Sequence, residues 1–96
     1  MYTNISYIAQ SYFHQDFDVE ADTPLGVVAA FRDSEPAAVV EALRAEIVAL
    51  LESDSTEEDL AKIWLDDADS QYDPETDGIT VRDWLLGMAE ALTAKK

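Results

Sequence analysis

The apolar residues of this chain recur every three or four positions, and this helical spacing restricts its fold more than any other feature of the sequence. The last such series consists of Val81, Trp84, Leu85, Met88 and Leu92, which would share one face of an α-helix. No stretch combines alternating apolar and polar residues with turn signals, as half-buried strands do. The sequence therefore predicts an all-α fold.

Proline and capping residues divide the first half of the chain into three predicted helices. The first covers residues 4–14. Thr23 can cap a second helix, and Pro24 suits the first helical position because its missing N–H would have no partner there. Pro36 ends the second helix, since proline disfavours helical geometry at the residue before it. A third helix is expected over residues 36–52.

Two further helices are predicted in the second half of the chain. Ser55 is followed three residues later by Glu58, the spacing of a capping box, so a helix is expected to start at Ser55. Thr80 and Asp83 have the same spacing at the start of the last helix. Residues 69–79 separate these two helices and are expected to form an irregular connection.

The length and the apolar content of the chain suit one hydrophobic core. It has 96 residues, of which 48% are apolar, so we predict a single domain over residues 1–96, built as a compact bundle of about five helices. Large apolar residues at helical spacing are expected in its core, namely Phe13, Phe31, Leu43, Ile47, Leu50, Ile63, Trp64, Trp84, Leu85 and Met88.

The chain is strongly acidic, with 21 Asp and Glu residues against 6 Lys and Arg and a net charge of −15. Such a surface repels phosphate backbones and anionic lipid headgroups, which argues against nucleic acid and membranes as partners. It favours encounter with basic proteins, because a field of one sign attracts the opposite sign. A purely solubilising role explains the composition equally well.

Other features of the composition narrow the compartment and the chemistry. The absence of cysteine excludes disulfides and thiolate metal sites. No apolar run approaches the roughly 18 residues of a membrane span, and the N-terminus has no secretory pattern. We therefore expect a cytoplasmic protein that is monomeric when free and needs no cofactor or metal.

The acidic residues are concentrated in residues 54–83, which contain eleven acids and two bases and carry −9 of the net charge. A one-signed cluster costs stability by self-repulsion, which makes it a candidate binding face. A solvated face of two surface helices is an equally good reading of the charge alone. The candidate partner-binding residues are Glu57, Glu58, Asp59, Asp66, Asp67, Asp69, Asp73, Glu75 and Asp77.

Two patterns that might indicate a metal or a catalytic site are incomplete. The segment from Asp73 to Gly78 has the acidic and glycine positions of a calcium loop, but Trp84 stands where a bidentate glutamate is required. A polar turn at Asp77-Gly78 is the better interpretation. His14 is the one histidine and has no apparent nucleophile or orienting group. We predict no catalytic residue and no enzymatic activity.

Several boxes along the chain share their order and spacing with a known family. The segment Tyr12-Phe13-His14-Gln15-Asp16-Phe17-Asp18 resembles the YFHQD-W/F-D box of immunity proteins from bacterial contact-dependent growth inhibition systems, the CdiI family. The similarity continues at Asp22-Thr23-Pro24 and Tyr72-Asp73-Pro74. It ends in a D-G-x-x-V-R-x-W-L pattern at residues 77–85.

The resemblance implies a non-enzymatic cytoplasmic protein that binds and neutralises a cognate toxin domain, often a nuclease. It also implies that the boxes are structural, with specificity on the acidic surface outside them. From the residues alone, an acidic helical regulatory module or nucleic-acid mimic that binds another basic protein remains the alternative. The structural residues implied by the boxes are the apolar Tyr12, Phe13 and Trp84 and a polar brace of His14, Asp16 and Arg82.

Overall fold

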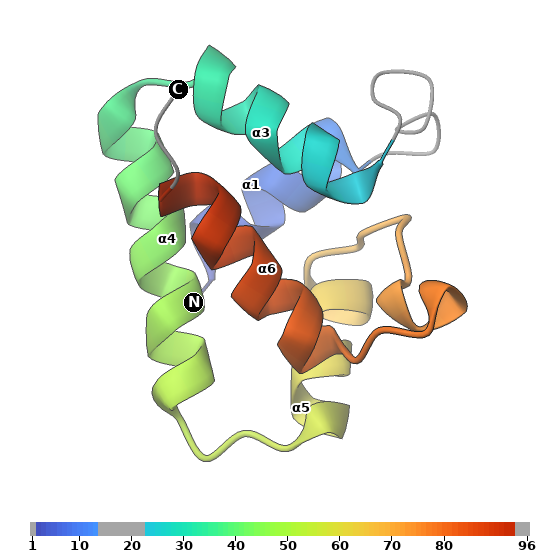
Figure 1. Cartoon of the computed structure of the whole chain (residues 1–96). Coiled ribbons are helices and arrows are strands. Elements are labelled where there is room, and N and C mark those ends of the chain that lie inside the picture. The colour runs from blue at the N-terminus through green and yellow to red at the C-terminus, as the bar shows by residue number, and fades with distance from the viewer. Residues whose placement is uncertain (1, 14–22, 94–96) are drawn as a thin grey trace.

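Helix α6 (Val81–Thr93) lies at the centre of the structure, a computed structural model that describes residues 2–13 and 23–93. Its neighbours are α3, α4 and α5, which surround it in Figure 1. All regular elements in the described residues are helices, which confirms the all-α prediction. The other elements are α1 (Thr3–Tyr12), α3 (Pro24–Ser34), α4 (Ala37–Glu52), α5 (Glu57–Ala61), the π-helix η1 (Lys62–Asp67) and the 3-10 helix η2 (Pro74–Asp77).

The apolar stripe predicted for the last helix is the buried face of α6. Its five members, from Val81 to Leu92, are all buried. Because α6 packs on three other helices, this one stripe joins the N-terminal and C-terminal halves of the chain. Nine of the ten residues predicted for the core are buried, whereas Ile63 is only partly buried and packs against the edge of the core.

Two of the predicted helix starts are confirmed by their capping hydrogen bonds. The side chain of Thr23 accepts a hydrogen bond from the Gly26 N–H at 3.0 Å. The Thr80 hydroxyl oxygen accepts one from the Asp83 N–H at 3.1 Å. These bonds satisfy backbone donors that have no partner within the helix.

The predicted start of the fourth helix is wrong by one residue. The capping box is formed by Thr56 and Asp59, each of which accepts the other's backbone N–H at 3.1 Å. Ser55 stays outside the helix, where its hydroxyl lies 2.8 Å from that of Ser53 and its carbonyl accepts a hydrogen bond from Arg82. The sequence offers two capping boxes, one starting at Ser55 and one at Thr56. The long-range bond from Arg82 occupies the Ser55 carbonyl, and the helix starts from Thr56.

The fourth helix also changes its winding along its length. After α5 the chain continues as η1, a π-helix in which the Ala68 N–H donates to the Ile63 carbonyl at 2.9 Å. Trp64 and Ala68 are both buried there. The segment ends at Asp69, whose φ of 58° is in the left-handed region that asparagine and aspartate tolerate better than most residues. No helix in the described residues is long and apolar enough to cross a membrane.

Candidate partner-binding surface

The nine acidic residues selected from the sequence lie on α5, η1, η2 and the connection between the last two. This part of the chain, yellow to orange in Figure 1, forms one side of the molecule beside the N-terminal end of α6. Two of them, Glu57 and Asp73, are half-buried. The exposed ones are Glu58, Asp59, Asp66, Asp67, Asp69, Glu75 and Asp77. We call these seven exposed residues the acidic face.

Glu57 has a structural task within the protein. Its carboxylate accepts hydrogen bonds from the backbone N–H groups of Val81 at 2.6 Å and Arg82 at 3.1 Å. These are the first N–H groups of α6, so Glu57 caps that helix from 24 positions away. A carboxylate at this end is also favoured by the helix dipole. Glu46 caps α1 in the same way, through the N–H groups of Asn4 and Ile5.

We predict that Glu57→Ala lowers stability by about 0.5–2 kcal/mol, as the loss of a helix cap does in other proteins. The reason is that the Val81 and Arg82 N–H groups lose their acceptor. The free energy of unfolding from urea denaturation measures the effect, and Glu58→Ala, at the exposed neighbouring position, is the control. Equal stabilities of the two variants would contradict the capping role.

Three residues of the acidic face and its surroundings also hold local structure. The Asp59 carboxylate belongs to the capping box of α5. Asp73 Oδ1 accepts the Glu75 N–H at 3.0 Å, and Asp77 Oδ2 accepts the hydroxyl of Tyr72 at 2.9 Å. Burial and this hydrogen bond raise the pKa of Tyr72, because both favour the neutral phenol. These hydrogen bonds hold the three carboxylates in position, and Asp59 and Asp77 remain exposed.

The residues of the calcium-like pattern make hydrogen bonds and a turn within the chain. Asp73 and Asp77 make the hydrogen bonds above, and Gly78 takes a φ of 75° at the end of η2, as expected for the predicted turn. Trp84, at the position of the required glutamate, is 2% exposed and lies in the core. In residues 2–13 and 23–93, no group of three or more His, Cys, Asp or Glu side chains could hold a metal.

The exposed carboxylates of Asp66, Asp67 and Asp69 lie where η1 ends. The Lys62 ammonium approaches Asp67 at 3.4 Å, but both side chains are more than half exposed, so this ion pair adds little stability. Asp66 and Asp67 are the last residues of η1, and Asp69 follows two positions later with a left-handed backbone. Three negative charges within four positions attract a cationic partner.

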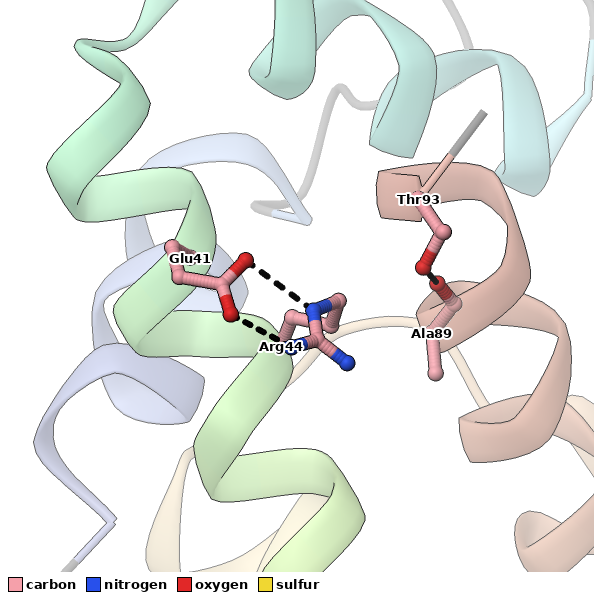
Figure 2. Close-up of polar contacts among 4 residues, drawn as sticks. All are labelled: Glu41, Arg44, Ala89 and Thr93. Atoms are coloured by element: carbon pink, nitrogen blue, oxygen red, sulfur yellow. Dashed lines mark hydrogen bonds and ion pairs between the residues drawn. The ribbon is translucent and has the colours of Figure 1, made fainter. Parts of the chain in front are cut away.

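The arginines of the chain are bound to groups of the chain itself. Arg44 pairs with Glu41 through two hydrogen bonds on the surface of α4, as Figure 2 shows beside the Thr93 to Ala89 bond at the end of α6. This partner lowers the pKa of Glu41. Arg32 donates to the Ala91 carbonyl at 3.0 Å. Neither arginine belongs to the segment that carries the acidic face, so they leave its negative charge in place.

Arg82, from the last family-like box, ties α6 to the connection between α4 and α5. Its Nη2 donates to the Ser55 carbonyl at 2.9 Å and its Nη1 to the Leu51 carbonyl at 3.4 Å. These contacts brace the fold. His14 and Asp16, the other members of the expected brace, lie outside the described residues.

Three aromatic residues of the boxes, Phe13, Tyr72 and Trp84, meet Trp64 in one cluster inside the bundle. The ring of Phe13 lies 5.4 Å from that of Trp64 and 5.5 Å from that of Trp84. Tyr72 lies 4.8 Å from Trp84, and its carbonyl accepts the indole N–H of Trp64 at 2.8 Å. Edge-to-face pairs of this kind add stability beyond burial. The cluster joins α1, η1, the 69–79 connection and α6.

Tyr12 has a separate role at the surface of α1. Its hydroxyl donates to Glu35 Oε2 at 2.7 Å, and that of Tyr7 donates to the same oxygen at 2.9 Å. Burial and the bond to Glu35 raise the pKa of Tyr12 to about 12. Both rings also contact Phe31 edge to face. This contact fastens α1 to the end of α3.

A cavity of about 270 Å³ beside the acidic face was not predicted from the sequence. It opens between the start of α3, the end of η2 and the middle of α6, and Asp77 is one of its lining residues. The one signal in the sequence was Gly87, a glycine within a helical apolar series, which costs stability there. The residues around it come from three separate segments, so spacing could not bring them together.

Comparison with known proteins identifies a family and a similar solved structure. The sequence model of a family described as CdiI immunity protein matches residues 1–92. A chain from the crystal structure of the CdiA-CT/CdiI complex of Y. kristensenii 33638 is similar, with a TM-score of 0.89 and 27% identity over 96% of this chain and 98% of that chain. No curated protein sequence matches. Since the family match covers nearly the whole sequence, this chain belongs to the CdiI immunity protein family.

Proposed function

We propose that this chain protects its cell by binding a cognate CdiA C-terminal toxin domain in the cytoplasm and neutralising it. The observation that carries the proposal is membership of the CdiI family, together with the similarity to a chain from a CdiA-CT/CdiI complex. The protein would act by binding, as a monomer before capture, without catalysis of its own.

We further propose that the cognate toxin is a basic domain, of the nuclease type, and that it docks on the acidic face. A nuclease needs cations to hold phosphate groups. Clustered carboxylates can occupy those cations in place of the nucleic acid and accelerate the encounter. The support in this chain is the concentration of seven exposed acids on α5, η1 and η2.

The test is co-expression with the C-terminal domain of a CdiA protein encoded next to this chain; where such a gene is found, this domain is the upstream-encoded toxin domain of the experiments below. The two proteins are expected to co-purify as a 1:1 complex, and the chain should restore growth to cells that express the toxin. A stoichiometric amount should also stop degradation of nucleic acid by the purified toxin. The matched control is the toxin domain of the Y. kristensenii complex. A chain of that complex is only 27% identical to this one, so a specific immunity protein should not neutralise that toxin.

Three results would contradict the proposal in different parts. Absence of both complex and protection would overturn the immunity function. Protection without any effect on nucleic acid would overturn the nuclease assignment alone. Equal neutralisation of both toxins would show that general acidity, instead of a specific surface, is responsible.

A further inference from the structure

We infer that the cavity between α3 and α6 is an anchor pocket for the toxin domain and that it receives one arginine side chain of that domain. The inference rests on the proposed function and adds to it the position and the chemistry of a specific contact. The cavity has a volume of about 270 Å³, which suits a single long side chain. Deeply inserted side chains of this kind supply most of the energy of many interfaces, and arginine is enriched among them.

The walls of the cavity are apolar and partly open to solvent. Leu25, in the first turn of α3, is 44% exposed and forms part of the wall. Ile79 comes from the segment before α6 and is partly buried. Such walls suit the methylene groups of an arginine, which cover apolar surface while the charged end reaches a polar partner.

Aromatic rings and carboxylates line the same cavity. Tyr72 and Trp84 are in the lining, but only 5% and 2% of their surfaces are exposed, so they close the apolar wall and offer no free ring face. Asp77 and Asp83 are also in the lining, and both are exposed. The Tyr72 hydroxyl holds Asp77 in place at 2.9 Å. Apolar walls and two exposed carboxylates together match arginine better than lysine, because the planar guanidinium can bind carboxylates through two parallel hydrogen bonds and the compact ammonium cannot.

Two features of the lining cost stability in the free protein. Gly87 stands in the interior of α6, where alanine would be favoured. A Cβ at Gly87 would meet only Leu25, with Cδ2 at 3.6 Å, an ordinary contact. Packing therefore does not require the glycine, and its missing side chain leaves more room in the cavity. The buried indole N–H of Trp84 has no hydrogen-bond acceptor within the described part of the chain. Unfavourable local choices of this kind are typical of functional surfaces.

The first experiment fills the cavity. Gly87→Leu should weaken binding of the upstream-encoded toxin domain by about 30-fold or more, because an occupied pocket cannot accept the anchor. Gly87→Ala, which leaves the helix intact, should raise Tm and weaken binding to a smaller extent. The control is Ala45→Leu, at an exposed position of α4, which should keep the affinity. Dissociation constants come from calorimetry, and melting curves verify that each variant folds.

The second experiment identifies the occupant. Each arginine of the toxin domain is changed to lysine in turn. The dissociation constant of each toxin variant is then measured with the parent chain and with the double variant Asp77→Asn, Asp83→Asn. One toxin arginine should show a large coupling with the two aspartates in a double-mutant cycle, and the others should show additive effects.

The outcomes separate this inference from the proposed function. If the parent binds the toxin and Gly87→Leu and Gly87→Ala bind as tightly, the anchor pocket is wrong and the immunity function stands. If filling weakens binding but no arginine couples to the aspartates, the assignment of the occupant is wrong. If the parent does not bind the toxin domain at all, both the inference and the proposed function fail.

Discussion

Changing Asp66 and Asp67 to lysine together with Asp69 to asparagine should abolish growth protection while the helices stay folded. The three carboxylates are exposed at the end of η1, and their replacement turns the most concentrated part of the acidic face positive. Asparagine is chosen at Asp69 because the φ of 58° there would strain a lysine. We expect the association rate with the toxin domain to fall by about tenfold or more at low salt.

The dependence of the association rate on salt is a second test of the same variant. Exposed charges are screened over a Debye length of about 8–10 Å near physiological ionic strength. The parent should therefore associate more slowly as salt rises, and the variant should lose most of this dependence. Stopped-flow measurements between low and high salt provide both values, and circular dichroism verifies the fold.

The matched control changes the net charge equally at exposed positions away from the acidic face. It combines Glu41→Lys and Glu90→Lys with Asp33→Asn, on α4, α6 and α3. This control should retain protection and most of the association rate. Equal loss in both variants would mean that the total charge matters and the acidic face does not. Loss in the control alone would move the interface to another side of the molecule.

Trp84→Ala should cause a large loss of stability. The side chain is 2% exposed and contacts the rings of Phe13, Trp64 and Tyr72. Its removal leaves a cavity at the junction of α6, η1 and α1, at a cost of about 3–5 kcal/mol. That is a large part of the total stability of about 5–15 kcal/mol for a domain of this kind.

Differential scanning calorimetry should show Tm lowered by roughly 12 °C or more, given the size of the chain. The control is Leu86→Ala on the same helix, where the side chain is 45% exposed and its loss should change stability by less than about 0.5 kcal/mol. A Trp84→Ala variant that melts with the parent would show that the aromatic cluster does not hold the bundle together.

The helices and most of the core could be predicted because their signals are local. The series from Val81 to Leu92 sets the buried face of α6 through spacing alone, and Thr23 and Thr80 mark helix starts through bonds to residues three positions away. The error at Ser55 arose where two neighbouring capping boxes were both possible. Local sequence could not decide between them, because the hydrogen bond from Arg82 comes from 27 positions away.

The sequence by itself determined the helical class, the large buried side chains and the concentration of acids in one segment, since each depends on residue type and short-range spacing. Only the tertiary structure decided which acids are available to a partner. In the folded chain Glu57 caps α6, whereas Asp66 and Asp67 are exposed. The pattern of charges along the sequence does not distinguish these acids. The tertiary structure also formed the cavity by bringing Leu25, Ile79 and Gly87 together. The packing of one helix against another sets these contacts, and the spacing along each helix specifies which face is buried but not what that face meets.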